Sequence, residues 1–217
     1  MRERLGETLK ERTAIMAAVA HDLRTPLTGL RLRVEGLPEA PREAAVADIA
    51  RMERLIAQLL AYVRGEDAPW TVEPLDLADL ARECVAGQVA MGRDVTLAAN
   101  GEHLVRGDRD QLERALANLI DNAVLYGDRA GVAVTSEANE IVCTIDDAGP
   151  GLPLDQLEAV FSPFRRLEAS RSRATGGAGL GLSISRAVIV RSGGRVALSN
   201  RPEGGGRATV RLPRLRE

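Results

Sequence analysis

The stretch EIVCTIDDAGPG (residues 140–151) joins an alternating apolar segment to a glycine-rich turn. Within it, Ile141, Cys143 and Ile145 fall on one side of the chain. Alternation with a period of two is typical of a strand in a half-buried sheet. Similar patterns predict further strands at 94–99, 104–107, 131–136, 195–200 and 207–212. We therefore expect one sheet with one buried face.

Helix patterns alternate with these strands. They lie at 76–91, 109–126 and 180–192. Within the second of them, the apolar stripe is formed by Leu112, Leu116 and Leu119. Helices with one apolar stripe pack on one face of a sheet, so this region is expected to form an α/β sandwich.

Two further helix patterns precede the sandwich and predict a helical hairpin. The first ends at the stretch GLPEAP (36–41), whose prolines and glycine break a helix, and the second ends near Gly65. One hairpin cannot bury both of its apolar stripes, whereas two hairpins paired by two-fold symmetry form a four-helix bundle. We therefore expect a homodimer, with packing of the hairpin on the sandwich as the alternative.

These patterns give an α+β protein with three parts. A helical hairpin domain is expected at 1–65, a proline-containing linker at 66–75, and the sandwich at 76–217. The linker holds Trp70, the single tryptophan of the chain, which is expected to pack between the two domains.

Composition excludes several classes of function. The 217 residues carry a formal charge of −2, and 2% of them are aromatic. Nucleic-acid binding needs a basic surface or exposed rings, so neither DNA nor RNA is expected as a partner. No apolar run approaches the ~20 residues that span a bilayer, so we expect a cytoplasmic chain that reaches a membrane only through segments absent here. Cys84 and Cys143 match neither a metal nor a disulfide pattern and are expected as buried thiols.

His21, within VAHDLRTPLTGL (19–30), is the first candidate for chemistry. At 100° per residue it points away from the apolar stripe of its helix. Thr25 follows one turn later on the same face. The adjacent Asp22 can accept a proton from the imidazole, which makes the other ring nitrogen a better nucleophile. A merely exposed or structural histidine is the alternative.

Three further segments suit a nucleotide. Asn118, Asn122 and Tyr126 share one face of the 109–126 helix, and neutral amide oxygens suit Mg²⁺ that is already bound to phosphates. Asp147 directly follows the strand predicted at 140–146, and its carboxylate can accept a hydrogen bond from an exocyclic amine such as that of adenine. The stretch GGAGLGL (176–182) leads into a helix and exposes backbone N–H groups to phosphate. The alternatives are a solvated polar face, an acidic tight turn and an ordinary glycine loop.

Together and in this order, these segments resemble the catalytic portion of sensor histidine kinases of two-component systems. The stretch 19–30 resembles the phosphoacceptor box, in the form found in the osmosensing subgroup. The other resemblances are NLIDNAVLY (118–126) to the asparagine box, DDAGPG (146–151) and GGAGLGLSI (176–184) to the two glycine boxes, FSPF (161–164) to the phenylalanine box, and GGGRATVRLP (204–213) to the C-terminal strand. The resemblance implies a dimeric four-helix bundle followed by a Bergerat (GHKL-type) ATP-binding domain.

The resemblance also implies a reaction. His21 would take the γ-phosphoryl group of ATP, with Asp22 as the adjacent base. The group would then pass to an aspartate of a response-regulator receiver domain. Thr25 would position water when the enzyme dephosphorylates that partner. A net phosphatase and a degenerate dimeric ATP-binding scaffold without kinase activity are the alternatives.

The nucleotide-binding residues follow from the same resemblance. Asn122 would bind Mg²⁺, Asn118 would orient the phosphates, Tyr126 would line the adenine side, and Asp147 would bind the adenine amine. The remaining contacts would come from Gly149, Gly151, Arg166, Gly177, Gly179, Leu180, Gly181 and Leu182, with 152–178 as the lid. One position departs from the family pattern: Leu125 stands where many members have Lys or Arg. Arg165 or Arg166 could supply that missing charge.

Overall fold

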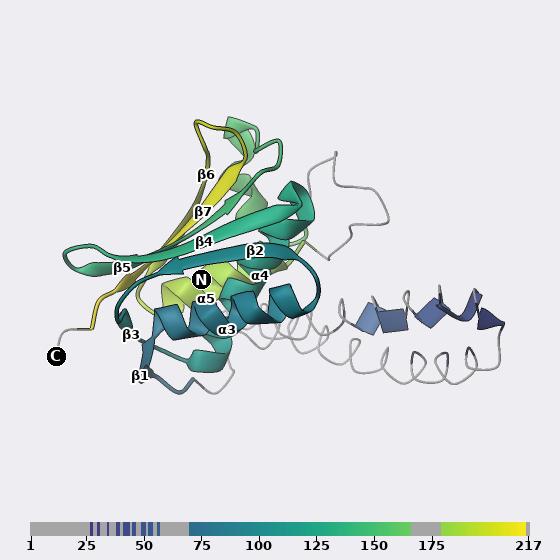
Figure 1. The fold of residues 1–217 in the computed structure, drawn as a ribbon, viewed down its shortest axis with the longest axis horizontal. Coiled ribbons are helices and arrows are strands. Elements are labelled where there is room, and N and C mark those ends of the chain that lie inside the picture. The colour runs from purple at the N-terminus through teal and green to yellow at the C-terminus, as the bar shows by residue number, and fades with distance from the viewer. Residues whose placement is uncertain are drawn as a thin grey trace, which may run out of the picture. The chain divides into compact units, whose positions relative to one another are not determined.

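The chain forms two compact units, a helical unit (Met1–Ala68) and a sandwich unit (Pro69–Glu217). The computed structural model, drawn in Figure 1, describes residues 70–165 and 179–215, together with Leu27, Leu30, Val34, 38–39, 41–43, 45–46, 49–50, 52–53 and Ile56. None of the helices among these residues is long and apolar enough to cross a bilayer.

In the helical unit, the two predicted apolar stripes meet. The buried residues that form this small core are Leu27, Val34, Ile49 and Ile56, with Ala45 and Val46 packed against them. Leu30 and Met52 belong to the same helices but are 46% and 48% exposed. The contact between the stripes agrees with a helical hairpin, and the hairpin leaves apolar surface uncovered.

In the described part of the sandwich unit, five strands form one sheet in the order β2-β4-β5-β7-β6 (Figure 1). They are β2 (Asp94–Ala99), β4 (Arg129–Ser136), β5 (Glu140–Asp147), β6 (Arg195–Asn200) and β7 (Gly206–Pro213). β2 and β4 run parallel, and the remaining neighbours are antiparallel. β5 is thus the central strand of this sheet, and Asp147 is its last residue.

The expectation of one sheet was wrong for the segment 104–107. This segment is β3 (Leu104–Gly107), which pairs with β1 (Glu73–Asp76) in a separate two-stranded sheet. β1 includes residues 73–75, which the sequence analysis assigned to the linker. β1 was not predicted because Pro74 weakens its strand pattern, although proline is tolerated in a strand with a free edge. Without β1, the segment 104–107 had no predicted partner outside the main sheet.

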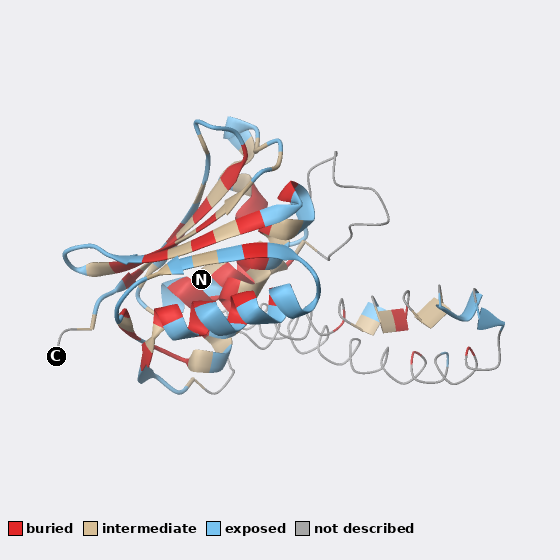
Figure 2. Ribbon diagram, in the orientation of Figure 1, coloured by how far each residue is buried: buried red, intermediate tan, exposed pale blue. Residues whose placement is uncertain are grey.

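Three helices cover one face of the five-stranded sheet, namely α3 (Leu77–Ala90), α4 (Arg109–Gly127) and α5 (Gly181–Arg191). Figure 2 shows buried residues where these helices face the strands. The α4 stripe Leu112, Leu116 and Leu119 is at most 2% exposed, as its spacing predicts. Two short 3-10 turns, η1 (Leu154–Gln156) and η2 (Ala159–Phe161), follow β5.

Two aspartates begin the longer helices. Asp76 accepts a hydrogen bond from the Ala78 backbone N–H, and Asp108 accepts one from Gln111. Each carboxylate thereby satisfies an amide that has no partner within its helix. The cysteines are buried free thiols, as expected, and burial raises the pKa of Cys84 to about 11 and that of Cys143 to about 12.

Candidate functional site

The last turn of α4 lies directly against the turn that follows β5. A Cβ atom on Gly127 would lie 2.6 Å from the backbone nitrogen of Ala148. A Cβ atom on Gly149 would lie 2.5 Å from the carbonyl oxygen of Tyr126. Only glycine permits this approach from both sides. The asparagine-bearing helix and the Asp147 turn (residues 147–152) therefore meet.

Asp147 is held in one orientation by backbone amides. Its Oδ1 accepts hydrogen bonds from the N–H of Gly149 at 2.8 Å and from the N–H of Gly206 at 2.9 Å. Within the described part of the chain, no donor reaches its other oxygen, Oδ2. The half-buried carboxylate thus presents one oxygen that is fixed in direction and able to accept a hydrogen bond.

The start of α5 faces α4 on its Asn118 side. A Cβ atom on Gly181 would lie 3.7 Å from the side chain of Asn118, which is ordinary contact distance. Gly179 has a φ of +72° and its carbonyl accepts a hydrogen bond from Phe164 at 3.0 Å. The N-terminus of α5 carries the positive end of a helix dipole. Asn118 and this helix end therefore lie next to each other, as a phosphate site requires.

The structure brings most of the described site candidates together. Asn118 and Asn122 are half-buried on one face of α4, and Tyr126 is 46% exposed at its end. Leu180 is fully buried, so its backbone but not its side chain is available to a ligand, and Leu182 is half-buried. The predicted residues His21, Asp22, Thr25, Arg166 and Gly177 lie outside the described residues.

Arg165, one of the two arginines expected to supply the positive charge missing at Leu125, contacts a different residue. Leu125 is 40% exposed. Arg165 donates a hydrogen bond to Gln156 at 2.8 Å, which ties it to η1. Arg165 therefore belongs to the segment after β5, and no described contact supports its expected role in place of a cation at position 125.

The loop between β6 and β7 (residues 201–205), with Asn200 and Gly206 at its two ends, lies at the site but was not predicted from the sequence as part of it. Asn200, Arg201, Gly205 and Gly206 all lie against the Asp147 turn. The available signal was the polar, glycine-rich stretch NRPEGGG between two strand patterns, which predicts a tight turn but gives no information on what the turn touches.

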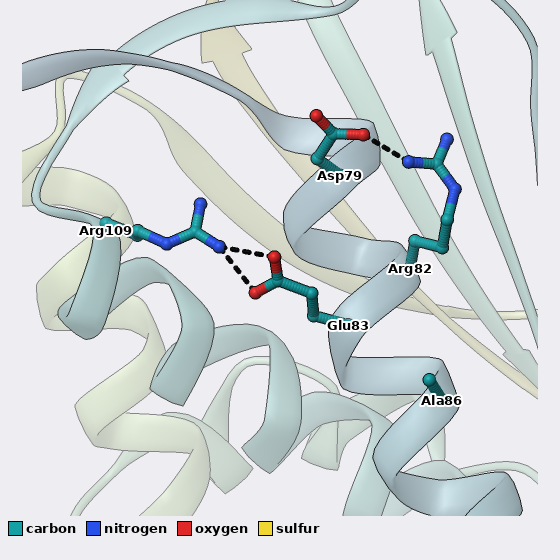
Figure 3. A pocket seen from close by; sticks show the side chains of 5 residues that line it. All are labelled: Asp79, Arg82, Glu83, Ala86 and Arg109. Carbon is teal, nitrogen blue, oxygen red and sulfur yellow. Dashed lines mark hydrogen bonds and ion pairs between the residues drawn. The ribbon is translucent and has the colours of Figure 1, made fainter.

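A separate hollow of about 270 Å³ lies on the outer side of α3 (Figure 3). Figure 3 shows its charges paired, Asp79 with Arg82 and Glu83 with Arg109. Arg109 is 13 residues before Asn122 on α4, a distance of about 20 Å along a helix. Because its charges are satisfied and it shares no residue with the site above, we assign it no function. Among the described residues, no cluster of three His, Cys, Asp or Glu side chains could hold a metal ion.

Two family models match the chain. Residues 107–216 match the family of histidine kinase-, DNA gyrase B- and HSP90-like ATPases. Residues 11–68 match the His Kinase A phosphoacceptor domain. The first match contains α4, the Asp147 turn and the start of α5, so the site described above lies within the ATPase domain.

Individual proteins agree with these matches. The sensor histidine kinase GtrS of Pseudomonas aeruginosa is 40% identical over 99% of this chain and 45% of its own length. The ATP-binding domain of PrrB from Mycobacterium tuberculosis is 27% identical, covers 67% of this chain and 98% of its own, and superposes with a TM-score of 0.56. The histidine kinase ThkA in complex with the response regulator TrrA has the same fold, with a TM-score of 0.67, 24% identity, and coverage of 99% of this chain and 64% of that one.

The chain spans about half the length of the curated relatives it matches. The phosphoacceptor match precedes the ATPase match along the chain, and the ATPase match contains both the asparagine-bearing helix and the two glycine segments. The chain belongs to the two-component sensor histidine kinases and contains their phosphoacceptor and ATP-binding domains.

Proposed function

We propose that the chain phosphorylates itself on His21 from ATP and passes the phosphoryl group to an aspartate of a response regulator. The observation that carries this proposal is the meeting of α4 with both glycine segments. Asn118 lies beside Gly181, and the end of α4 lies against the Asp147 turn. One face of one helix thereby joins a base-binding end to a phosphate-binding end.

Asp147 is the proposed contact for the adenine ring. Its Oδ2 faces no described donor, while Oδ1 is held by two backbone amides. The free oxygen accepts the adenine amine, and the exposed ring of Tyr126 lines the same end. Gly149 and Gly151 shape the turn, because side chains there would collide with Tyr126 and with Asn200.

The other end is proposed to hold the triphosphate. The N–H groups at Gly179–Gly181 point toward phosphate from the start of α5, and Asn118 orients it from α4. Asn122 offers a neutral amide oxygen, a donor type that fits Mg²⁺ bound mainly by phosphates and water. That ion would neutralise phosphate charge, while the protein supplies position.

The transfer forms one bond and breaks one. A ring nitrogen of His21 attacks the γ-phosphorus, the bond from that phosphorus to the β–γ bridging oxygen breaks, and ADP leaves. Asp22 accepts the proton from the other ring nitrogen, which keeps the attacking nitrogen nucleophilic. Thr25 is assigned to positioning the water that removes the phosphoryl group from the regulator in the phosphatase reaction.

Dimerisation through the helical hairpin is part of the proposal. Leu30 and Met52 are nearly half exposed in a single chain. A second hairpin related by two-fold symmetry would cover them and complete a four-helix bundle. We place the phosphoacceptor domain at 1–65, the linker at 66–75 and the ATP-binding domain at 76–217. We place this reaction, which consumes ATP, in the cytoplasm.

Labelling with γ-phosphate-labelled ATP tests this function. The purified chain should gain an acid-labile, base-stable label that transfers to a response regulator, and His21→Gln should abolish it. His103→Gln is the matched control, since the other histidine is 4% exposed and both its ring nitrogens are bonded, to Ser136 and to Asn100. Absence of label at every Mg²⁺ concentration would support the scaffold alternative instead.

A further inference from the structure

The β6–β7 loop closes over the far end of the Asp147 turn through Asn200. The Asn200 Oδ1 accepts the N–H of Leu152 at 2.8 Å, and its Nδ2 donates to the Leu152 carbonyl at 2.7 Å. One side-chain amide thus satisfies both backbone groups of one residue. Gly151, with a φ of +74°, leaves room for it, since a Cβ there would lie 2.7 Å from Asn200 Oδ1.

Arg201 holds the near end of the same turn. Its Nη1 donates to the backbone carbonyl of Asp147 at 3.1 Å, and its Nε lies 3.4 Å from Oδ2 of Asp146. Asp146 is itself held by Arg207 through two hydrogen bonds of 2.6 and 2.7 Å. The guanidinium therefore lies beside the Asp146 carboxylate, and its one hydrogen bond to a described residue goes to the Asp147 backbone.

The loop itself is built to approach this closely. Gly205 has a φ of +89°, and a Cβ there would lie 2.0 Å from the Asp147 carbonyl oxygen. Arg201 N–H bonds to the Gly205 carbonyl at 2.9 Å, which closes the loop. Gly206 then donates to Asp147 Oδ1. Asp147 is therefore held at its carbonyl and at its carboxylate by one loop, and its turn is closed by Asn200.

We propose that Asn200 and Arg201 are positioning residues that set the base selectivity of the site by fixing where Asp147 Oδ2 points. A carboxylate distinguishes an exocyclic amine from a carbonyl only if its oxygen is held in place, because a mobile carboxylate turns to water or to another donor. Neither residue needs to touch the nucleotide. This inference rests on the proposed function, in which Asp147 binds the base.

The test compares two nucleotides that differ at one group. ADP carries an amine at purine position 6, and IDP carries a carbonyl there. Dissociation constants for both are measured by calorimetry on the full chain, for wild type, Asn200→Ala and Arg201→Ala. Each variant should weaken ADP binding by about tenfold, because a displaced Asp147 carboxylate loses the charge-assisted hydrogen bond from the adenine amine, and should leave IDP binding nearly unchanged.

Matched controls come from the same strand. Ser199→Ala is adjacent to Asn200 and faces the other side of the sheet. Arg195→Ala removes an Arg–Glu pair at the far end of β6, where Arg195 bonds to Glu140. Both controls should keep the wild-type ratio of ADP to IDP affinity. Thermal unfolding of every variant shows which of them fold. If Arg201→Ala does not fold, the ADP and IDP affinities of Asn200→Ala alone test the inference.

The outcomes separate this inference from the proposed function. If wild type prefers ADP and both loop variants keep that preference, or lose ADP and IDP equally, the loop is merely structural and the inference is wrong. If wild type does not distinguish ADP from IDP, the role of Asp147 in reading the base is wrong, and this inference fails with it. Phosphorylation of His21 is a separate measurement that either result leaves standing.

Discussion

The two ends of α4 are built in opposite ways. At its start, Asp108 caps the helix through Oδ1 and accepts the Thr71 backbone N–H through Oδ2 at 2.8 Å. Trp70 lies beside this point with the Arg191 guanidinium 4.4 Å from its ring centre. At the other end, Gly127 and Gly149 bring backbones together, and the ring of Tyr126 stays exposed.

This difference separates anchoring from binding. The first end uses side chains to satisfy backbone groups, and it fixes the segment that enters the sandwich unit. The second end uses missing side chains to create a close approach, and it leaves Asp147 Oδ2 able to accept a ligand. Changes at the first end should alter stability, and changes at the second should alter nucleotide binding.

The largest effect is expected from Gly149→Ala. A Cβ there would lie 2.5 Å from the Tyr126 carbonyl, so the Asp147 turn must move away from α4. Moving the turn breaks the proposed hydrogen bond from the adenine amine to the Asp147 carboxylate, which is worth up to about 3 kcal/mol, so we expect ADP affinity to fall by about 100-fold. Overpacking should also lower the free energy of unfolding by about 1–3 kcal/mol. Calorimetry and urea unfolding measure the two quantities.

Gly87→Ala is the matched control for this variant. Gly87 lies inside α3, and nothing is within 4 Å of the position of its Cβ. Alanine in a helix interior should raise the free energy of unfolding by about 0.5–1 kcal/mol and leave ADP affinity unchanged. If Gly149→Ala bound ADP as well as Gly87→Ala does, the close approach at the end of α4 would not shape the site.

Asp108→Ala should show the opposite profile. The variant loses a helix cap and the bond to Thr71, each worth about 1 kcal/mol. We expect the free energy of unfolding to fall by about 2 kcal/mol while the ADP dissociation constant stays within twofold of wild type. Asp110→Ala removes an exposed acid from the same helix turn and should cost only a few tenths of a kcal/mol. Loss of ADP affinity in Asp108→Ala would mean that the two ends are coupled.

The same contrast explains what sequence could reveal. Residues that face the core repeat with helix or strand periods, so Leu112, Leu116 and the strand at 140–146 were predictable. Glycine segments mark places where backbones approach, so the Asp147 turn and the start of α5 were found as well. Both kinds of pattern are local, and each element of the sandwich unit depends on them.

Contacts between distant segments leave no such pattern. Nothing in the sequence pairs Asn200 with Leu152, or Arg201 with Asp147, because the register of β5 against β7 decides which loop meets which turn. Trp70 was expected between domains, and its described contact is with Arg191 inside the sandwich unit. These placements follow from tertiary structure and are invisible to periodicity.

A smaller effect is expected at the contact between Trp70 and Arg191. A half-exposed cation–π pair contributes about 0.5–1 kcal/mol, so Trp70→Leu should lower the free energy of unfolding of the sandwich unit by that amount. Arg191→Ala provides the second arm of a double-mutant cycle, with unfolding measured for both single variants and the pair. The ADP dissociation constant should stay unchanged in all three. A coupling energy of zero would show that this contact does not anchor the linker.

The smallest effect near neutral pH concerns the core between the two ends of α4. Cys84 lies on α3 and its thiol donates to the Glu113 carbonyl of α4 at 3.6 Å, while Cys143 is fully buried on β5. Burial raises the pKa of Cys84 to about 11 and that of Cys143 to about 12, from an ordinary value of 9.0. In the window above pH 9 the folded chain therefore binds more protons than the unfolded chain.

The sign of the pH dependence follows from that difference. The stabilising contribution of the protonated thiols is complete below pH 9 and is lost as pH rises through about 11, so the free energy of unfolding should fall across this window. Urea unfolding of wild type and of a Cys84→Ala, Cys143→Ala double variant from pH 7 to 10.5 measures it under reducing conditions. The double variant is less stable at pH 7 because it leaves cavities, yet its decline with pH should be shallower. Parallel curves would show that neither thiol is buried in solution, because a core that excludes water from both sulfurs must resist their ionisation.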